Sequence, residues 1–150
     1  MEYSEGRLGR VFVIRLEDGE DLISSLDRFL AEKEVASGTI LFLGALRRGR
    51  LITGPREPTI PPTSPFVEDL EGGWETFGVA TIYPGGEGEP RVHIHASVGR
   101  SDKVLTGCLR ERADVYLVVE AVVFEILGLG ARRLLDERSG LLLPVLEERF

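Results

Sequence analysis

The chain has 150 residues, of which 43% are hydrophobic and 29% charged, a composition typical of a globular protein with a sizeable core. Its net charge of −7 and isoelectric point near 4.9 argue against a broad nucleic-acid-binding surface, because such a surface needs clustered lysine and arginine. The single cysteine excludes an intramolecular disulfide, and no signal peptide or membrane-spanning run is visible. We therefore expect one cytoplasmic domain over residues 1–150, with no membrane partner.

The first third of the chain predicts a strand, a helix and a second strand. Residues 9–16 are rich in β-branched and aromatic side chains, as strands are. The acidic residues Glu20 and Asp21 then favour a helix start, and an apolar face at helical spacing follows them. The apolar run 39–45 predicts a strand buried on both faces, in which Gly44 marks a bulge or a close backbone approach.

The middle of the chain contains a predicted loop. A short neighbouring strand is expected at residues 51–53, and five of the eight prolines then lie between Pro55 and Pro65. This density of proline rules out regular structure there. A loop of this length is usually functional or forms an arm in an oligomer.

The rest of the chain predicts strands separated by turns. Residues 75–83 have strand character, and the glycine-rich turn after Pro84 leads directly into a strand at 91–99, so an antiparallel hairpin is expected. Four more strands are predicted, at residues 104–110, 115–126, 131–135 and 141–146. The predicted fold class is α+β, a largely antiparallel sheet with one main helix packed on it.

Both histidines of the protein lie in the strand at 91–99. They alternate with aliphatic residues, so His93 and His95 share one face of the strand, with Cα atoms roughly 6.5–7 Å apart. At that separation the two imidazoles can converge on one ion or one ligand. The aliphatic residues point the other way, into the core.

The order of several motifs resembles that of the plants and prokaryotes conserved (PPC) domain. The resemblance covers roughly residues 9–145 and is carried by the segments Arg15–Leu22, Gly44–Leu46, His93–Gly99, Thr106–Leu109, Val119–Val123 and Leu135–Leu141. It implies an α+β fold that assembles as a homotrimer, with the histidines near subunit contacts. It also implies a role in regulation or in association with DNA, since plant members act in transcription through a separate AT-hook, and a metal bound by histidines in some stand-alone members.

One departure from the family pattern affects the site. Where the family usually has Gly-Gly-His-Leu, this chain has Thr106-Gly107-Cys108-Leu109, so Cys108 replaces a third histidine. A thiolate is as good a zinc ligand as an imidazole. His93, His95 and Cys108 therefore form a candidate site for zinc or another divalent transition metal. The alternative is that the histidines are polar residues on a wet sheet face and that Cys108 fills the core.

Two acidic residues are candidates for a supporting role. Glu120 interrupts an otherwise apolar strand, and a buried carboxylate must be paired, protonated or metal-bound. It is a candidate metal ligand, partner of a ligating imidazole, or general base. The alternatives are a solvent-facing strand or an arginine partner across a subunit interface. Glu75, beside Trp74, has the same ambiguity.

Arg47, Arg48 and Arg50 are the candidate nucleic-acid contacts. The order Arg-Gly-Arg is similar to that of an AT-hook, but Leu51 stands where the hook needs proline. Because strand-like sequence frames the tripeptide, we interpret these residues mainly as charges along a solvated strand edge.

Three functional hypotheses follow. The first is a non-enzymatic, homotrimeric regulatory or DNA-associated protein with a metal or small-ligand site on the histidine strand. The second is a metal-dependent enzyme that acts on a small substrate, with Glu120 as general base. The third is direct binding of DNA through Arg47, Arg48 and Arg50, presented three times in a trimer so that weak single contacts add up. It is compatible with the family resemblance and is disfavoured by the net charge.

Overall fold

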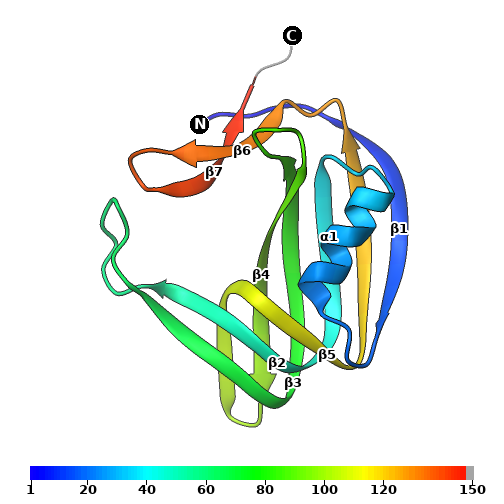
Figure 1. The fold of residues 1–150 in the computed structure, drawn as a ribbon, viewed down its shortest axis with the longest axis vertical. Helices are drawn as coiled ribbons and strands as arrows, with labels where there is room; N and C mark the ends of the chain where they lie inside the picture. Colours follow the sequence, from blue (N-terminus) through cyan, green and yellow to red (C-terminus); the bar gives the residue numbers. More distant parts are fainter. Residues whose placement is uncertain (148–150) are drawn as a thin grey trace.

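The computed structural model describes residues 1–147, so the last three residues of the predicted domain lie outside the described part (Figure 1). The elements, in chain order, are β1 (Arg7–Glu17), α1 (Leu22–Glu32), β2 (Gly38–Pro55), β3 (Pro65–Pro84), β4 (Pro90–Arg100), β5 (Lys103–Leu127), β6 (Ala131–Asp136) and β7 (Leu141–Leu146). The described chain is therefore mostly antiparallel sheet with one helix of 11 residues. The α+β prediction fits in part, because the helix is short and the sheet dominates.

The main sheet has the strand order β1-β5-β2-β3-β4, and β5 also pairs with β4. The first half of β5 pairs with β4 and with the second half of β2, so these strands close on themselves. In Figure 1, β5 runs diagonally across the molecule between these partners. The hairpin predicted around the glycine-rich turn is confirmed, because β3 and β4 are antiparallel and pair from Glu75–Gly99 to Pro84–Pro90.

Two pairs of predicted strands are each one continuous strand. Residues 39–45 and 51–53 both belong to β2, and residues 104–110 and 115–126 both belong to β5. The separate strands were wrong because the charged residues between them stay hydrogen-bonded to neighbouring strands, with register shifts that absorb the irregularity. The arginines of β2 are therefore inside the sheet, between β3 and β5, and not at a strand edge.

Helix α1 begins as the acidic residues predict. The Asp21 side chain is the N-cap and accepts from the backbone N–H of Ser24 at 2.8 Å. Its second oxygen accepts from the backbone N–H of Ala113 at 2.7 Å, which joins the helix start to β5. Leu22, Leu26 and Leu30 form the buried face of the helix and pack on the sheet. The main core lies between α1 and the sheet.

Gly44 makes the close approach that the sequence predicts. It has φ of +148°, and a Cβ atom at this position would lie 2.3 Å from the carbonyl oxygen of Val118. The pairing of β2 with β5 shifts register between Gly44 and Leu46. A glycine is required here because β5 passes too close for any side chain.

The prediction that residues 39–45 are buried on both faces is wrong for the single chain. Ile40 and Phe42 are in the core, but Leu41 and Leu43 are 47% and 57% exposed. They lie on the side of the sheet opposite α1, with three other exposed apolar side chains. We call this set the outer apolar face: Val13, Leu41, Leu43, Phe77 and Val79.

Two hairpins project beyond the core and frame the region of the histidines. One is the arm formed by the ends of β2 and β3 with the proline-rich loop, and the other is the β6–β7 hairpin (Figure 1). Strands β6 and β7 pair with each other and form a separate two-stranded sheet. Within residues 1–147 no helix is long and apolar enough to span a bilayer.

Candidate metal centre

The alternation along β4 orients the two histidines as the sequence predicts. Ile94, Ala96 and Val98 are buried in the core, so the side chains of His93 and His95 leave the opposite face of the strand. The centroids of the two imidazole rings are 4.8 Å apart, and the ring planes are nearly perpendicular, at 88°. The rings are therefore close enough to bind the same ion.

The pairing of β4 with β5 brings the cysteine to the histidines. His95 is directly opposite Cys108 in this antiparallel ladder, across the tight turn at Ser101 and Asp102. One ligand atom from each of His93, His95 and Cys108 lies within 4.8 Å of the other two. His95 is exposed, His93 is half-buried and Cys108 is buried, so the group runs from the surface inward.

The three donors fit a divalent transition metal. Zinc binds imidazole nitrogen and thiolate sulfur at about 2.0–2.3 Å, which places tetrahedral donors about 3.3–3.8 Å apart. The present separations of up to 4.8 Å need to close by about 1 Å, which small side-chain rotations supply. Two imidazoles and a thiolate are a donor set that favours zinc or copper over the hard cations calcium and magnesium.

The protonation states of the buried donors follow from their surroundings. Burial, together with the positive charges of Arg133 and Arg110 and the neighbouring His95, lowers the pKa of His93 to about 4. His93 is therefore neutral at pH 7, with a ring nitrogen free to bind a metal. Burial raises the pKa of the Cys108 thiol, and the neighbouring Arg110 opposes that rise. A bound metal would deprotonate this thiol.

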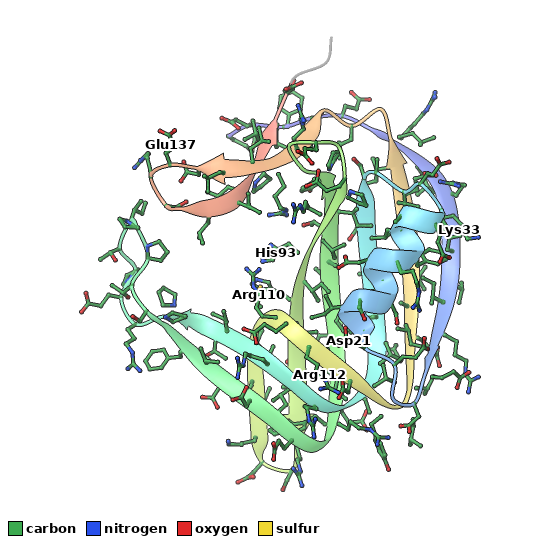
Figure 2. The ribbon with its side chains drawn as sticks, in the orientation of Figure 1. Asp21, Lys33, His93, Arg110, Arg112 and Glu137 are labelled. Atoms are coloured by element: carbon green, nitrogen blue, oxygen red, sulfur yellow. The ribbon has the colours of Figure 1, made fainter. Side chains whose placement is uncertain are left out.

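A cavity of about 600 Å³ adjoins the histidines. It lies between β4 and the β6–β7 hairpin, and its lining includes His93, Arg110 and Arg133. Figure 2 shows His93 and Arg110 close together, pointing into the space between this hairpin and the β2–β3 arm. The candidate metal ligands therefore stand at the wall of a site large enough for a small molecule.

Of the two interpretations of Glu120, a buried carboxylate and a solvent-facing one, the structure supports the solvent-facing one. Its side chain is exposed on the outer side of β5, where the strand register runs from Glu120 across Leu43 and Phe77 to Ser97. This places Glu120 three strand positions from β4, roughly 14 Å at about 4.8 Å per strand. Sequence alternation alone does not show which side of β5 the helix covers. In the single chain Glu120 cannot act as a base or ligand at the histidines.

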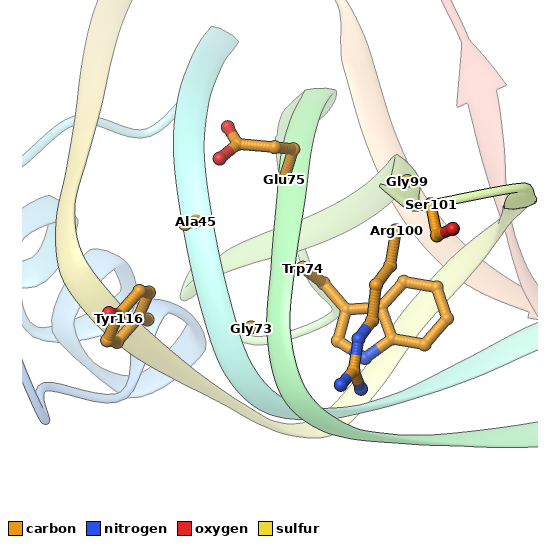
Figure 3. Close-up of a pocket in the computed structure, with 8 residues that line it drawn as sticks. All are labelled: Ala45, Gly73, Trp74, Glu75, Gly99, Arg100, Ser101 and Tyr116. Carbon is orange, nitrogen blue, oxygen red and sulfur yellow. The ribbon is translucent and has the colours of Figure 1, made fainter.

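Glu75 is also remote from the histidines. It is exposed and pairs with Gly99, four residues along β4 from His95, which is about 13 Å at the usual strand rise. Figure 3 shows it beside a different pocket, in which the guanidinium of Arg100 lies along the indole of Trp74. The supporting role predicted for Glu75 therefore does not hold in the single chain.

Two of the three candidate nucleic-acid contacts form ion pairs with acidic neighbours. Arg47 forms an ion pair with Asp18, and Arg50 forms two, each at 2.8 Å, with Asp69 and Glu111. Arg48 lies between them on the same strand. An AT-hook needs an extended segment that is free to enter a minor groove. The ion pairs and the two neighbouring strands leave these arginines without that freedom.

Two residues of the site were not predicted from the sequence. Arg110 lies two residues after Cys108 on the same face of β5, a spacing that alternation could have shown. Arg133 comes from β6, and only the folding of the β6–β7 hairpin over β4 brings it to His93. Nothing in the local pattern of β6 indicates that contact.

The chain matches one protein family and several solved structures. The model of the Plants and Prokaryotes Conserved (PCC) domain matches residues 3–127. No curated protein sequence matches the chain. A metal-containing protein from Archaeoglobus fulgidus is 27% identical, with a TM-score of 0.83 over 97% of this chain and 99% of that chain.

Two more distant structures show the same fold. A plant- and prokaryote-conserved protein from Pyrococcus horikoshii is 24% identical, with a TM-score of 0.79 over 98% of this chain and 99% of that chain. A candidate DNA-binding protein from Bacteroides thetaiotaomicron is 21% identical, with a TM-score of 0.74 over 95% of this chain and 96% of that chain. The strands that carry the histidines and line the cavity in this chain are part of the fold that it shares with these structures.

Proposed function

The chain belongs to the Plants and Prokaryotes Conserved domain family, and we propose that it is a single-domain, non-enzymatic member that binds a divalent transition metal. His93, His95 and Cys108 are the proposed ligands. The observation that carries the proposal is the convergence of these three side chains, whose ligand atoms lie within 4.8 Å of one another. The metal-containing relative from Archaeoglobus fulgidus supports it.

The proposed metal is zinc, bound by two neutral imidazoles and one thiolate. Three protein ligands leave one coordination position of zinc for a small molecule or water. When bound, the metal would supply a Lewis-acidic centre at the cavity wall. The exposed, distant Glu120 argues against the enzymatic alternative, because a general base must lie within hydrogen-bond reach of the group that it deprotonates.

The proposed assembly is a homotrimer, as the family resemblance implies. The outer apolar face supports self-association, since Leu43 and Phe77 are 57% and 66% exposed and lie side by side on neighbouring strands. A monomer rarely leaves such a contiguous apolar patch in water. The exposed leucines of β7 add a second apolar surface in the hairpin above the cavity.

The proposed biological role is regulatory or associated with DNA, through this assembly and its ligand. The relative from Bacteroides thetaiotaomicron is a candidate DNA-binding protein, but its similarity to this chain is a similarity of fold alone. The net charge of −7 and the ion-paired Arg47 and Arg50 oppose direct contact with phosphates. We therefore favour regulation through a bound ligand over direct DNA binding.

Metal content decides the central proposal. The full chain is loaded with zinc, dialysed and analysed for metal, and about one ion per chain is expected. The double variant His93→Ala/His95→Ala is expected to retain almost none. Thr106→Ala, two residues from Cys108 on the same strand, is the matched control and keeps the metal. Equal metal content in the wild type and the double variant would remove the site.

Cobalt(II) tests the sulfur ligand separately. A cobalt–thiolate bond produces near-ultraviolet charge-transfer absorption, which the wild type should show and Cys108→Ser should lack. Retention of that band in Cys108→Ser contradicts the assignment of this thiol. Because only one cysteine is present, any thiolate signal from the chain comes from Cys108.

Two further measurements address assembly and DNA. Sedimentation equilibrium should give three times the chain mass of 16.6 kDa. Titration with an A·T-rich duplex should show weak binding that disappears as salt rises. A monomeric mass contradicts the trimer, and tight, salt-resistant binding of the duplex contradicts the preference for a ligand-regulated role.

A further inference from the structure

Arg133 is a buried cation with only neutral partners. It is 7% exposed, and its guanidinium donates to the carbonyl oxygen of Leu142 at 3.1 Å and to the hydroxyl of Thr81 at 3.0 Å. The same group lies over the ring of Tyr83, 5.6 Å from its centroid. Burying a charge among neutral groups costs free energy unless a counter-ion joins it.

The Arg133 side chain also has a free hydrogen-bond donor. Its Nε–H is buried and has no acceptor among residues 1–147. Buried donors are nearly always paired, so an unpaired one in a charged group is a recognised sign of an absent acceptor. Because Arg133 lines the cavity beside His93, a molecule in that cavity can supply the acceptor and the negative charge.

A second arginine, Arg110, lines the same cavity. Arg110 lies on β5, two residues beyond Cys108, and lines the cavity together with His93. Figure 2 shows the side chains of Arg110 and His93 next to each other. No ion pair joins Arg110 to a carboxylate among the described residues. Its charge is close enough to Arg133 for each to act on the other.

The lining of the cavity is positively charged, whereas the molecule as a whole is negatively charged. The chain has 25 acidic and 18 basic residues, yet the described residues that line the cavity include three arginines and no carboxylate. The third, Arg91, is already paired with Glu89 at 2.7 Å. Arg110 and Arg133 therefore remain as two guanidinium groups without counter-ions in one recess.

We propose that this cavity binds a small organic anion, whose carboxylate or phosphate group is held between Arg110 and Arg133. The proposal rests on the proposed function and deepens it by naming the ligand class of the same site. Guanidinium groups match carboxylate and phosphate oxygens in planar, two-pronged hydrogen bonds. The apolar wall formed by Leu142, Leu143 and Pro144 fits the carbon skeleton of such an anion.

The dimensions of the cavity favour a small molecule over a DNA backbone. Its volume of about 600 Å³ is that of a typical metabolite site. Arg133 is a buried residue of β6, whereas contacts to duplex phosphates are made by side chains on an accessible surface. The anion in question is therefore a free molecule that enters the recess.

The metal and the anion should strengthen each other. Two neutral imidazoles and one thiolate would leave a divalent ion with one net positive charge beside the two arginines. An anion in the cavity offsets that charge, and by linkage each ligand raises the affinity for the other by the same factor. In the absence of metal the arginines alone still attract the anion, so its binding is measurable in both states.

The test is a titration of the full-length, metal-free protein with inorganic phosphate and, separately, with succinate, followed by calorimetry. The wild type should bind at least one of them, and the pair of titrations separates a phosphate from a carboxylate ligand. Arg110→Gln and Arg133→Gln should each weaken binding by at least about tenfold, the loss expected from one charge-assisted hydrogen bond. Arg132→Gln is the matched control and leaves binding unchanged.

Arg132 suits this role because it precedes Arg133 in β6 and donates instead to the carbonyl oxygens of Gly85 and Gly86, at 3.2 and 2.8 Å. If Arg133→Gln fails to fold, the exposed Arg110 decides the test by itself. Absence of binding to both anions in the wild type, or equal binding in Arg110→Gln and Arg132→Gln, overturns the proposal. Binding of a DNA duplex with the same dependence on Arg110 also overturns it.

The outcomes separate this inference from the proposed metal site. Anion binding that depends on Arg110 and persists in His93→Ala/His95→Ala, in a protein that retains no zinc, supports the anion site while the metal site fails. Zinc bound at one ion per chain without any anion binding does the reverse. A rise in anion affinity on adding zinc supports both.

Discussion

On the side of the sheet covered by α1, apolar side chains are buried by the leucines of the helix, and the main core closes. On the opposite side, side chains just as apolar are left in water beside two histidines, a cysteine and two arginines without counter-ions. The two sides of the same strands therefore have different roles. The helix side stabilises the fold, and the outer side is available for ligands and for other copies of the chain.

Truncation of a core leucine should give the largest effect on stability. Leu26→Ala removes a fully buried side chain from the contact between α1 and the sheet and should cost about 2–5 kcal/mol of unfolding free energy. Leu43→Ala on the outer apolar face is the matched control and should cost less than about 1 kcal/mol in the monomer. Denaturant titration at low protein concentration measures both. Similar losses would contradict the difference between the two sides.

Both sides of the sheet depend on the path of β2, so a substitution of Gly44 should lower the stability of the protein. Gly44→Ala combines a left-handed backbone angle with a clash against Val118 and should cost about 2–4 kcal/mol. Gly54→Ala is a matched control, since Gly54 also has a positive φ of +123° but has no atom within 4 Å of its Cβ position. Equal losses in thermal unfolding would show that the close approach of β5 contributes nothing.

The ion pair between Arg10 and Glu125 should make the stability of the protein depend on pH in the acidic range. Hydrogen bonds from Arg10 lower the pKa of Glu125 from 4.5 to about 2, and Arg10 also donates to the carbonyl oxygen of Lys33 after α1. Because the folded-state value is the lower one, the stabilisation is complete above pH 4.5 and is lost as the pH falls toward 2.

Glu125→Gln should therefore cost about 1–2 kcal/mol at pH 7, a discounted figure because Arg10 is 51% exposed and water screens the pair. The difference from the wild type should narrow below pH 4.5. Glu120→Gln, on the outer side of the same strand, should change stability by less than about 0.5 kcal/mol. Denaturant titrations at several pH values measure the three proteins, and a difference that does not depend on pH would exclude the ion pair as its source.

A substitution on the outer apolar face should change monomer stability least. Its effect should be confined to self-association. Phe77→Ser replaces a side chain that is 66% exposed, so the stability of the monomer should hardly change. Self-association should weaken, because apolar area at the subunit contact is lost. Sedimentation velocity over a range of concentrations measures this, and unchanged association would exclude this face from the contact.

The candidate site shows where reasoning from the sequence succeeds. Alternation along β4 is a local property of the chain, so it correctly placed His93 and His95 on one face. The close approach at Gly44 was predictable for a similar reason, since glycine within an apolar strand has few other uses. Asp21 as the helix cap likewise follows from its position before an amphipathic segment.

The same reasoning failed where the answer depended on the partner of a strand. Glu120 in an apolar strand suggested burial, but its side of β5 is the one that α1 does not cover. Leu41 and Leu43 suggested a strand buried on both faces, but in the single chain they face solvent. A pattern of period two separates the two faces of a strand without showing what covers either of them.

The sequence by itself determined the local features of this protein: which segments are extended and which is helical, the shared face of the two histidines, the glycine at the crossing with β5, and the family. Tertiary structure alone decided that Cys108 lies opposite His95, that Glu120 is remote, and that Arg133 joins the histidines from a later hairpin. The physical reason is the distance along the chain over which each kind of information acts. Periodicity reports the environment of each residue along its own strand, whereas strand pairing and hairpin packing join residues that are far apart in the chain.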